Sequence, residues 1–234
     1  HDDQHGTSIT LLAALMNSAK LTGKHLSDLT IVINGAGAAG TAIAELLLGH
    51  GYPDIESVKQ VLICDRKGIL SPDRPDLANL VAKQSLAVLT NPECKNGSLA
   101  DALVGADVFV GVSSANCVTQ AMVRSMNPDP FIFAMANPIP EIMPDEAKAA
   151  GASVVGTGRS DFNNQINNVL IFPGIFRGAI NARSKTITPK MKVAAAKALA
   201  ESVRDITPEA VIPSVLDKDV SYQVAKAVEA AATL

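Results

Sequence analysis

The chain has 234 residues, of which 47% are hydrophobic and 18% charged, and its formal net charge is −3 at pH 7. This length and composition are typical of a globular protein with one large domain or two small ones. The mild negative charge offers no basic surface for nucleic acid, and no apolar stretch reaches the ~20 residues that span a bilayer. We therefore expect neither a nucleic acid nor a membrane as partner.

Short apolar segments alternate with helical patterns over the first two thirds of the chain. Apolar residues at helical spacing predict a first helix over residues 7–18. Segments that are apolar on both faces then predict five buried strands, at 30–33, 61–64, 108–111, 131–134 and 153–155. The helices expected between them cover residues 38–48, 76–83, 98–104, 119–125 and 144–150. This alternation predicts an α/β fold with a doubly wound, mainly parallel, Rossmann-like sheet and right-handed crossovers.

The composition changes after Pro189, where alanine-rich amphipathic helices are predicted over residues 191–203 and 222–232. Their alanine faces allow close packing against the sheet or against another subunit. We therefore expect an α/β domain at residues 1–168 and a C-terminal helical segment at residues 169–234.

The first predicted strand runs directly into a glycine-rich loop, so that residues 30–40 read TIVINGAGAAG. Gly35 would allow a tight turn, Gly37 would let the backbone approach a pyrophosphate, and Gly40 would let helix and strand pack closely. The next strand ends at Asp65, whose carboxylate would accept hydrogen bonds from an adenosine ribose. A tight turn without a ligand is the alternative, but the order of strand, loop, helix, strand and acid favours a dinucleotide in the domain 1–168.

An acidic pair opens the chain. Of Asp2 and Asp3, one carboxylate could bind a hard divalent cation while the other orients a neighbouring base. Solvated acids or a helix cap are the alternative. The histidines His1 and His5 beside them are more simply explained as structural or exposed residues.

Asparagines follow two of the predicted strands. Pro138 keeps Asn137 out of the helical region, which aims an amide toward a nicotinamide ribose or a substrate carboxylate. A turn asparagine that bonds its own backbone is the alternative. Asn167 and Asn168 lie in a second amide-rich segment and are also candidate ligands.

The three cysteines, Cys64, Cys94 and Cys117, are scattered and have no paired spacing. Free thiols in a reducing compartment explain them, so we expect a cytoplasmic protein. We find no convincing general base in the sequence.

Several longer motifs follow one another in order: HDDQHGT, INGAGAAG, CDRKG, FAMANPIPE and GTGRSDFNNQINNVLIFPGIFRG. Together they resemble malic enzymes of the small bacterial type over essentially the whole chain. The resemblance implies the cofactor-binding portion of an enzyme that oxidises malate with NAD or NADP and decarboxylates the product to pyruvate and CO2. It also implies a Mg²⁺ or Mn²⁺ ion that chelates the substrate and stabilises the enolate left by decarboxylation.

The resemblance also assigns roles to individual residues. It matches Asp3 to a metal-binding carboxylate and Asp2 to a neighbour that supports the catalytic lysine. It matches the pyrophosphate loop to Gly35, Gly37, Ala38, Ala39 and Gly40, with Asp65 at the ribose. It matches Asn137 and Asn168 to asparagines that face cofactor and substrate, with Asn167 beside them.

The family's tyrosine acid, lysine base and other metal carboxylates precede the HDDQHGT motif and have no counterpart here. We therefore expect a fragment that has negligible turnover by itself. Malolactic chemistry and a non-catalytic dinucleotide-binding module are the alternatives. Asp65 favours NAD, whereas Arg66 and Lys67 could accommodate the 2′-phosphate of NADP. The family is usually oligomeric, so we expect a homodimer or a larger homo-oligomer.

Overall fold

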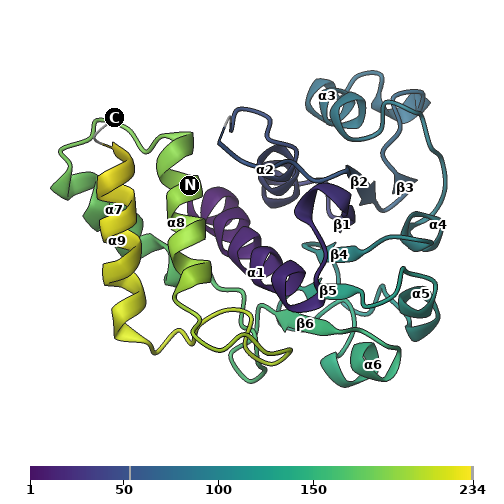
Figure 1. Cartoon of the computed structure of the whole chain (residues 1–234). Helices are drawn as coiled ribbons and strands as arrows, with labels where there is room; N and C mark the ends of the chain where they lie inside the picture. Colours follow the sequence, from purple (N-terminus) through teal and green to yellow (C-terminus); the bar gives the residue numbers. More distant parts are fainter. Residues whose placement is uncertain (53, 233–234) are drawn as a thin grey trace.

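The computed structural model describes residues 1–52 and 54–232, which build a six-stranded sheet with helices on both faces (Figure 1). The strand order is β3-β2-β1-β4-β5-β6, and all neighbours are parallel except β3, which runs antiparallel to β2. The strands are β1 Thr30–Asn34, β2 Gln60–Asp65, β3 Gly68–Ile69, β4 Val108–Gly111, β5 Phe131–Ala134 and β6 Val154–Thr157. The doubly wound, mainly parallel fold is therefore confirmed, and β3 is the one strand among the described residues that the sequence did not predict.

The sheet separates two hydrophobic cores. In β1, Ile31 and Ile33 point into one core together with residues of α1 and α2, whereas Val32 points into the other with residues of α4, α5 and α6. This alternation follows from the two-residue repeat of a strand. Because helices cover both faces of the sheet, the strands are apolar on both sides. Continuous apolar segments in the sequence therefore predicted their positions.

The helices follow the predicted alternation, with one error. They are α1 Thr7–Thr22, α2 Ala38–Leu47, α3 Val81–Thr90, α4 Leu99–Leu103, α5 Gln120–Arg124, α6 Pro144–Ala149, α7 Phe172–Asn181, α8 Pro189–Glu201 and α9 Lys218–Ala232. The helix predicted over residues 76–83 is wrong, since Pro75–Leu77 forms a short 3₁₀ turn and α3 begins only at Val81. The buried side chain of Leu77 anchors that turn, so the chain changes direction before the helix starts.

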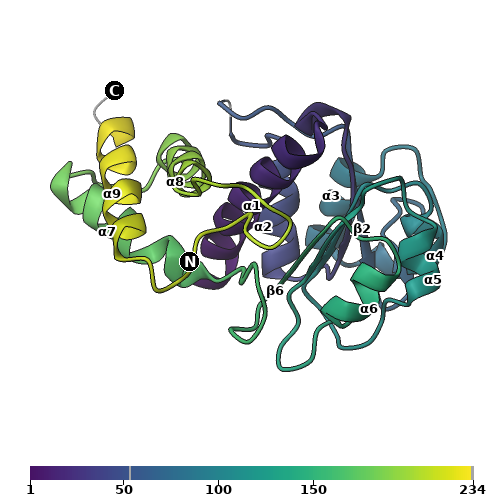
Figure 2. The same cartoon turned by 60° about the horizontal axis from the view of Figure 1, so that its bottom comes forward.

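The C-terminal helices lie on the side of α1 away from the sheet (Figure 2). Gly174 and Gly178 let α7 pack closely on α9, because a Cβ atom at these positions would lie only 2.6 and 2.7 Å from atoms of Val224 and Val228. The buried amide of Asn17 donates hydrogen bonds from α1 to two backbone carbonyls of the C-terminal segment. The boundary at residue 168 stays a prediction.

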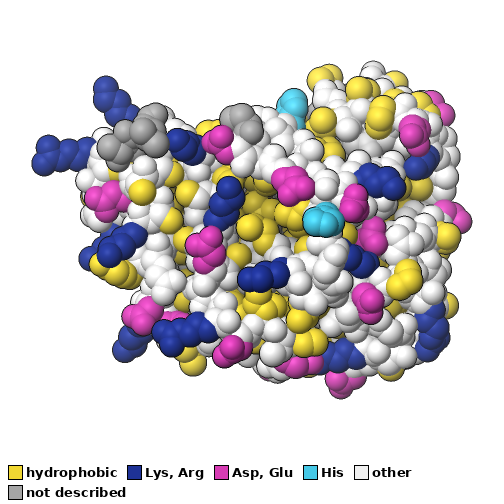
Figure 3. Space-filling model, in the orientation of Figure 1, with side chains coloured by type: hydrophobic (Ala, Val, Ile, Leu, Met, Phe, Trp, Pro, Cys, Tyr) yellow, Lys and Arg dark blue, Asp and Glu magenta, His cyan; other side chains and the backbone are white. Residues whose placement is uncertain are grey.

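On the face shown in Figure 3, acidic and basic side chains are interspersed, and hydrophobic side chains are visible between them. Within the described residues, no helix is long and apolar enough to cross a membrane.

Candidate functional site

The glycine loop joins the end of β1 to the start of α2. Gly35 has a φ of +132°, and a Cβ atom there would lie 2.7 Å from the carbonyl oxygen of Val112. A Cβ atom on Gly40 would overlap the carbonyl oxygen of Gly35, so loop and helix touch through backbone atoms. Around Gly37, in contrast, the space that a Cβ atom would enter is open. Gly37 also precedes α2 without a side-chain cap, which leaves the first N–H groups of the helix available to an anion.

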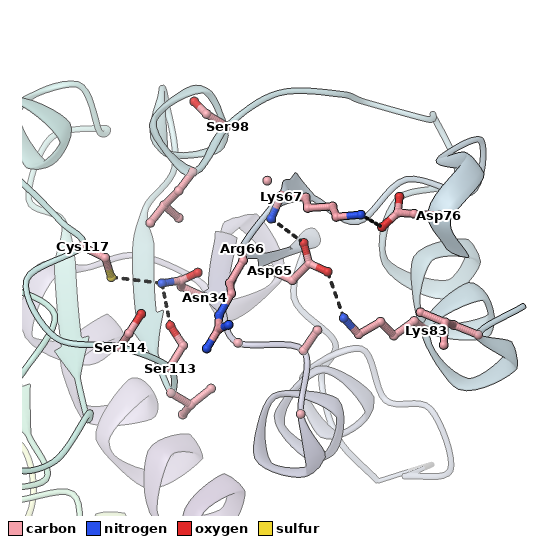
Figure 4. A pocket seen from close by; sticks show the side chains of 17 residues that line it. Asn34, Asp65, Arg66, Lys67, Asp76, Lys83, Ser98, Ser113, Ser114 and Cys117 are labelled. Atoms are coloured by element: carbon pink, nitrogen blue, oxygen red, sulfur yellow. Dashed lines mark hydrogen bonds and ion pairs between the residues drawn. The ribbon is translucent and has the colours of Figure 1, made fainter. Parts of the chain in front are cut away.

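A cavity of about 950 Å³ opens in front of this loop (Figure 4). Gly35, Gly37, Asp65 and Arg66 line it, together with residues that follow β4. It therefore lies at the carboxyl ends of β2, β1 and β4, where sheets of this kind bind their ligands. Of the other predicted loop residues, Ala39 lines a neighbouring cavity, whereas Ala38 and Gly40 line neither.

The Asp65 carboxylate is held by two cations. Arg74 donates to both of its oxygens, at 3.0 and 3.3 Å, and Lys83 donates to Oδ2 at 2.9 Å. The backbone N–H of Lys67 donates to Oδ1 at 2.9 Å. Burial opposes the charge on Asp65, but these hydrogen bonds outweigh it and lower the pKa of the carboxyl below its ordinary value. Figure 4 shows the Arg66 guanidinium pointing away from this carboxylate, toward the side of the cavity where Asn34 lies.

Sequence reasoning missed Arg74 and Lys83. They lie 9 and 18 residues beyond Asp65, and Arg74 immediately precedes the 3₁₀ turn Pro75–Leu77. A single sequence does not show that a basic residue so far along the chain contacts Asp65, because no local pattern indicates that the chain turns back toward it.

A second cavity, of about 350 Å³, lies beyond β4 and β5. Asp3, Asn137, Asn167 and Asn168 all line it, although they come from three separate parts of the chain. The π-helical turn Asp2–Gly6 presents Asp3, whose side chain is 83% exposed. Asp2 lines neither cavity, and its Oδ1 atom lies beside Gly6 instead.

The three asparagines are not equivalent. Asn167 accepts a hydrogen bond from the backbone N–H of Val169 at 3.0 Å and so caps a 3₁₀ turn, Asn168–Leu170. The side-chain nitrogen of Asn137 lies against Gly158, where a Cβ atom would come within 2.7 Å of it. The amide of Asn137 therefore lies close against the backbone at the end of β6.

Glu141 is a second group that sequence reasoning did not single out, although it lies in the FAMANPIPE motif. Its side chain is fully buried, and its Oε1 and Oε2 atoms accept hydrogen bonds from the backbone N–H groups of Ser113 and Ala136, at 3.2 and 3.0 Å. Burial raises the pKa of the Glu141 carboxyl, while these two N–H donors act in the opposite direction. A glutamate next to two prolines in a loop gave no hint of burial.

The described residues do not by themselves form a metal centre. Within residues 1–52 and 54–232, no group of three or more His, Cys, Asp and Glu side chains is arranged to hold an ion. Asp3 could supply one carboxylate, and further ligands would have to come from elsewhere.

The strand order, the glycine loop and the acid at the end of β2 define a dinucleotide-binding domain of the Rossmann type. The family model described as "Malic enzyme, NAD binding domain" matches residues 4–233. The chain therefore belongs to the malic enzyme NAD-binding domain family.

Curated relatives agree with this assignment. The chain is 53% identical to a bifunctional malic/malolactic enzyme of Bacillus subtilis, over 99% of this chain and 55% of that protein. It is 46% identical to an NAD-dependent malic enzyme of Geobacillus stearothermophilus, over 99% of this chain and 47% of that protein. It is 43% identical to an NADP-dependent malic enzyme of Halomonas elongata, over 94% of this chain and 50% of that protein. The chain thus spans about half the length of these relatives.

Solved structures show the same similarity. An NAD-dependent malic enzyme from Thermotoga maritima superposes with a TM-score of 0.90 at 44% identity, over 98% of this chain and 59% of that one. A malic enzyme from Entamoeba histolytica superposes with a TM-score of 0.91 at 38% identity, over 99% of this chain and 48% of that one.

Proposed function

We propose that this domain binds the dinucleotide for the oxidative decarboxylation of malate to pyruvate and CO2. The observation that carries the proposal is the 950 Å³ cavity, which joins the glycine loop to Asp65 at the ends of adjacent strands. The family assignment supports the same reaction class. When bound, the dinucleotide supplies the acceptor for the hydride that malate loses.

Within this proposal, the glycine loop holds the pyrophosphate. Gly37 offers open space and the start of α2 offers free N–H groups, while Gly35 allows the turn and Gly40 lets α2 pack closely on the loop. Ala38 and Ala39 contribute backbone atoms of the first helical turn, and Arg66 supplies a cation at the cavity wall.

We propose NAD as the preferred cofactor, with NADP as the alternative. Asp65 would accept hydrogen bonds from the ribose hydroxyls of NAD and would repel a 2′-phosphate. Arg74 and Lys83 already pair with this carboxylate, which weakens the repulsion. The preference for NAD is therefore expected to be modest.

The second cavity is proposed to hold the nicotinamide ribose and malate, with Asn137, Asn167 and Asn168 as ligands. Support comes from the fact that all three line the same 350 Å³ space with Asp3. We propose Asp3 as one ligand of a Mg²⁺ or Mn²⁺ ion and Asp2 as a support for the catalytic base. Both roles need further ligands and a base that the described residues do not supply.

The first test is calorimetric titration of the chain with NAD and, separately, with NADP, each with and without Mg²⁺ and malate. Micromolar binding of NAD that is tighter than binding of NADP is the expected result. If neither nucleotide binds, the proposal for the cavity is wrong. If NADP binds more tightly, the proposal holds for the cavity and fails for the cofactor preference.

Malolactic conversion is a second candidate, because the relative at 53% identity is described as a bifunctional malic/malolactic enzyme. The two reactions differ in product, so an assay of the enzyme that contains this domain would separate them. Pyruvate with reduced cofactor would indicate malic activity, whereas lactate without net cofactor reduction would indicate malolactic activity.

We also propose a homodimer or larger homo-oligomer and a cytoplasmic location. Phe176 and Ile180, which are 49% and 73% exposed, form an apolar strip on α7, as expected of a contact surface. Light scattering of the purified protein would test the first proposal.

The proposed cytoplasmic location rests on the thiols. Cys64, Cys94 and Cys117 are free, which suits a reducing compartment.

A further inference from the structure

Glu141 lies directly behind the wall that the two cavities share. Ser113 lines both cavities, and Ala136 lines the second. Both residues belong to loops, since Ser113 follows β4 and Ala136 follows β5. Backbone hydrogen bonds from Val112 to the Asn34 carbonyl and from Met135 to the Gly111 carbonyl hold the residue just before each of them.

The Glu141 carboxylate joins these two loops. One oxygen accepts the N–H of Ser113 and the other accepts the N–H of Ala136. Gly111, the last residue of β4, has no side chain, and a Cβ atom there would overlap the carboxyl group. The carboxylate therefore fills a space that this glycine keeps open.

The backbone around Glu141 strengthens the same connection. The carbonyl oxygens of Pro140 and Glu141 accept hydrogen bonds from the N–H groups of Asn116 and Val118, each at 3.0 Å. In addition, the Asn34 amide at the end of β1 donates to the Ser113 hydroxyl at 2.9 Å. The loop after β4 is thus fixed on one side to β1 and on the other to Glu141.

We infer that Glu141 is a positioning residue that holds the loops after β4 and β5 in the arrangement that receives the nicotinamide half of the dinucleotide. It touches neither cavity, so it acts through Ser113 and Ala136. The inference rests on the proposed function, because it presumes that a dinucleotide spans both cavities.

The Glu141→Gln variant tests this role with minimal change in size. A glutamine amide has one acceptor oxygen, so one of the two backbone N–H groups must face an NH2 donor instead. The shared wall then relaxes in the free protein and has to be re-formed on binding. We expect NAD affinity to fall by about tenfold.

ADP is the matched ligand, because it carries the adenosine and both phosphates but lacks the second ribose and the nicotinamide. Its affinity should stay unchanged in Glu141→Gln. Asp107→Asn is the matched variant. Asp107 is also a buried carboxylate that accepts a backbone N–H, from Thr30, but it precedes β4 at the opposite edge of the sheet. This variant should lose stability without changing the NAD to ADP affinity ratio.

Two further measurements cover the case in which Glu141→Gln folds poorly. Gly111→Ala leaves Glu141 in the chain but displaces its carboxyl group. It should also weaken the binding of NAD and leave the binding of ADP unchanged. In the unaltered chain, NAD but not ADP should slow amide hydrogen exchange at Ser113 and Ala136 together.

The outcomes separate the two proposals. Loss of NAD affinity with ADP unchanged supports the role of Glu141. Equal loss for both ligands, or loss of stability alone, overturns it while the cofactor site stands. If the unaltered chain binds neither ligand, the proposed function fails and this inference fails with it.

Discussion

The two ends of the candidate site each hold a carboxylate, but with different kinds of partner. At the end of β2, Asp65 is paired with the long cationic side chains of Arg74 and Lys83, which remain in contact with solvent. Beyond β4 and β5, Glu141 has no contact with solvent and is bound by two backbone N–H groups. Flexible side chains can follow a ligand, whereas backbone donors fix the shape of a loop.

This difference suggests a division of labour. The Asp65 end can adjust its charges to the ribose or to a ribose phosphate, because its cations can exchange partners. The Glu141 end holds the geometry in which a hydride would be transferred, and geometry there tolerates little error.

Removal of the buried carboxylate should have the largest effect on stability. Glu141→Ala leaves the N–H of Ala136 buried and the N–H of Ser113 partly buried without an acceptor, and a buried donor without a partner costs about 1–3 kcal/mol. We expect the free energy of unfolding to fall by roughly 3 kcal/mol in urea titrations. Glu93→Ala, which changes an exposed glutamate, is the control and should change little. A fall below about 1 kcal/mol would mean that the loops find other acceptors.

Asp65→Ala should cost less, about 1–2 kcal/mol, because Arg74 keeps its ion pair with Asp76 and Lys83, at 35% exposure, can turn toward water. Salt should shrink this cost, since it screens partly exposed ion pairs more than buried hydrogen bonds. Urea titrations at low and high ionic strength measure both effects. If salt left the destabilisation by Asp65→Ala unchanged, Asp65 would be held as rigidly as Glu141, and the proposed difference between the two ends would be wrong.

The pH dependence of Asp65 follows from its lowered pKa. A carboxyl whose pKa is lower in the folded state contributes stability that is fully present above its ordinary pKa of 3.8 and is lost as pH falls through the folded value. The stability gap between the unaltered chain and Asp65→Asn should therefore be constant near neutral pH and close only under acid conditions. Thermal unfolding of both proteins over this range provides the measurement. A gap that closed well above pH 3.8 would contradict the lowered pKa.

Much of this molecule could be predicted from its sequence, because short-range patterns determine it. The strands were found from their apolar character, and Gly35, Gly37 and Asp65 were placed at one cavity because parallel strands end at the same edge of the sheet. The family resemblance singled out Asp3, Asn137 and Asn168 one by one, and in the structure all three line one cavity.

The partners of these residues could not be predicted. Arg74 reaches Asp65 from the position just before a 3₁₀ turn, and the Glu141 carboxyl group lies where a side chain on Gly111 would be. Each contact depends on a backbone path that a local pattern does not specify. Residues that support the site, such as Arg74 and Glu141, can therefore be identified only from the structure, even where the sequence already indicates which residues face the ligand.

The smallest predicted effect concerns cofactor preference. It tests whether the cations at Asp65 can exchange partners when a ligand binds. Lys83→Ala leaves Arg74 as the remaining cationic donor to Oδ2 of Asp65, which makes room for a ribose hydroxyl, and removes a cation that would face a 2′-phosphate. We expect the ratio of NAD to NADP affinity to rise about fivefold, as loss of one charge-assisted contact predicts. Lys95→Ala is the control, since the Lys95 side chain pairs with Glu93 and does not line this cavity. Equal shifts in the two variants would show that the general positive charge, and not the Lys83–Asp65 contact, sets the preference. No shift in either would mean that Arg74 alone neutralises Asp65, so that this end of the site is as rigid as the Glu141 end.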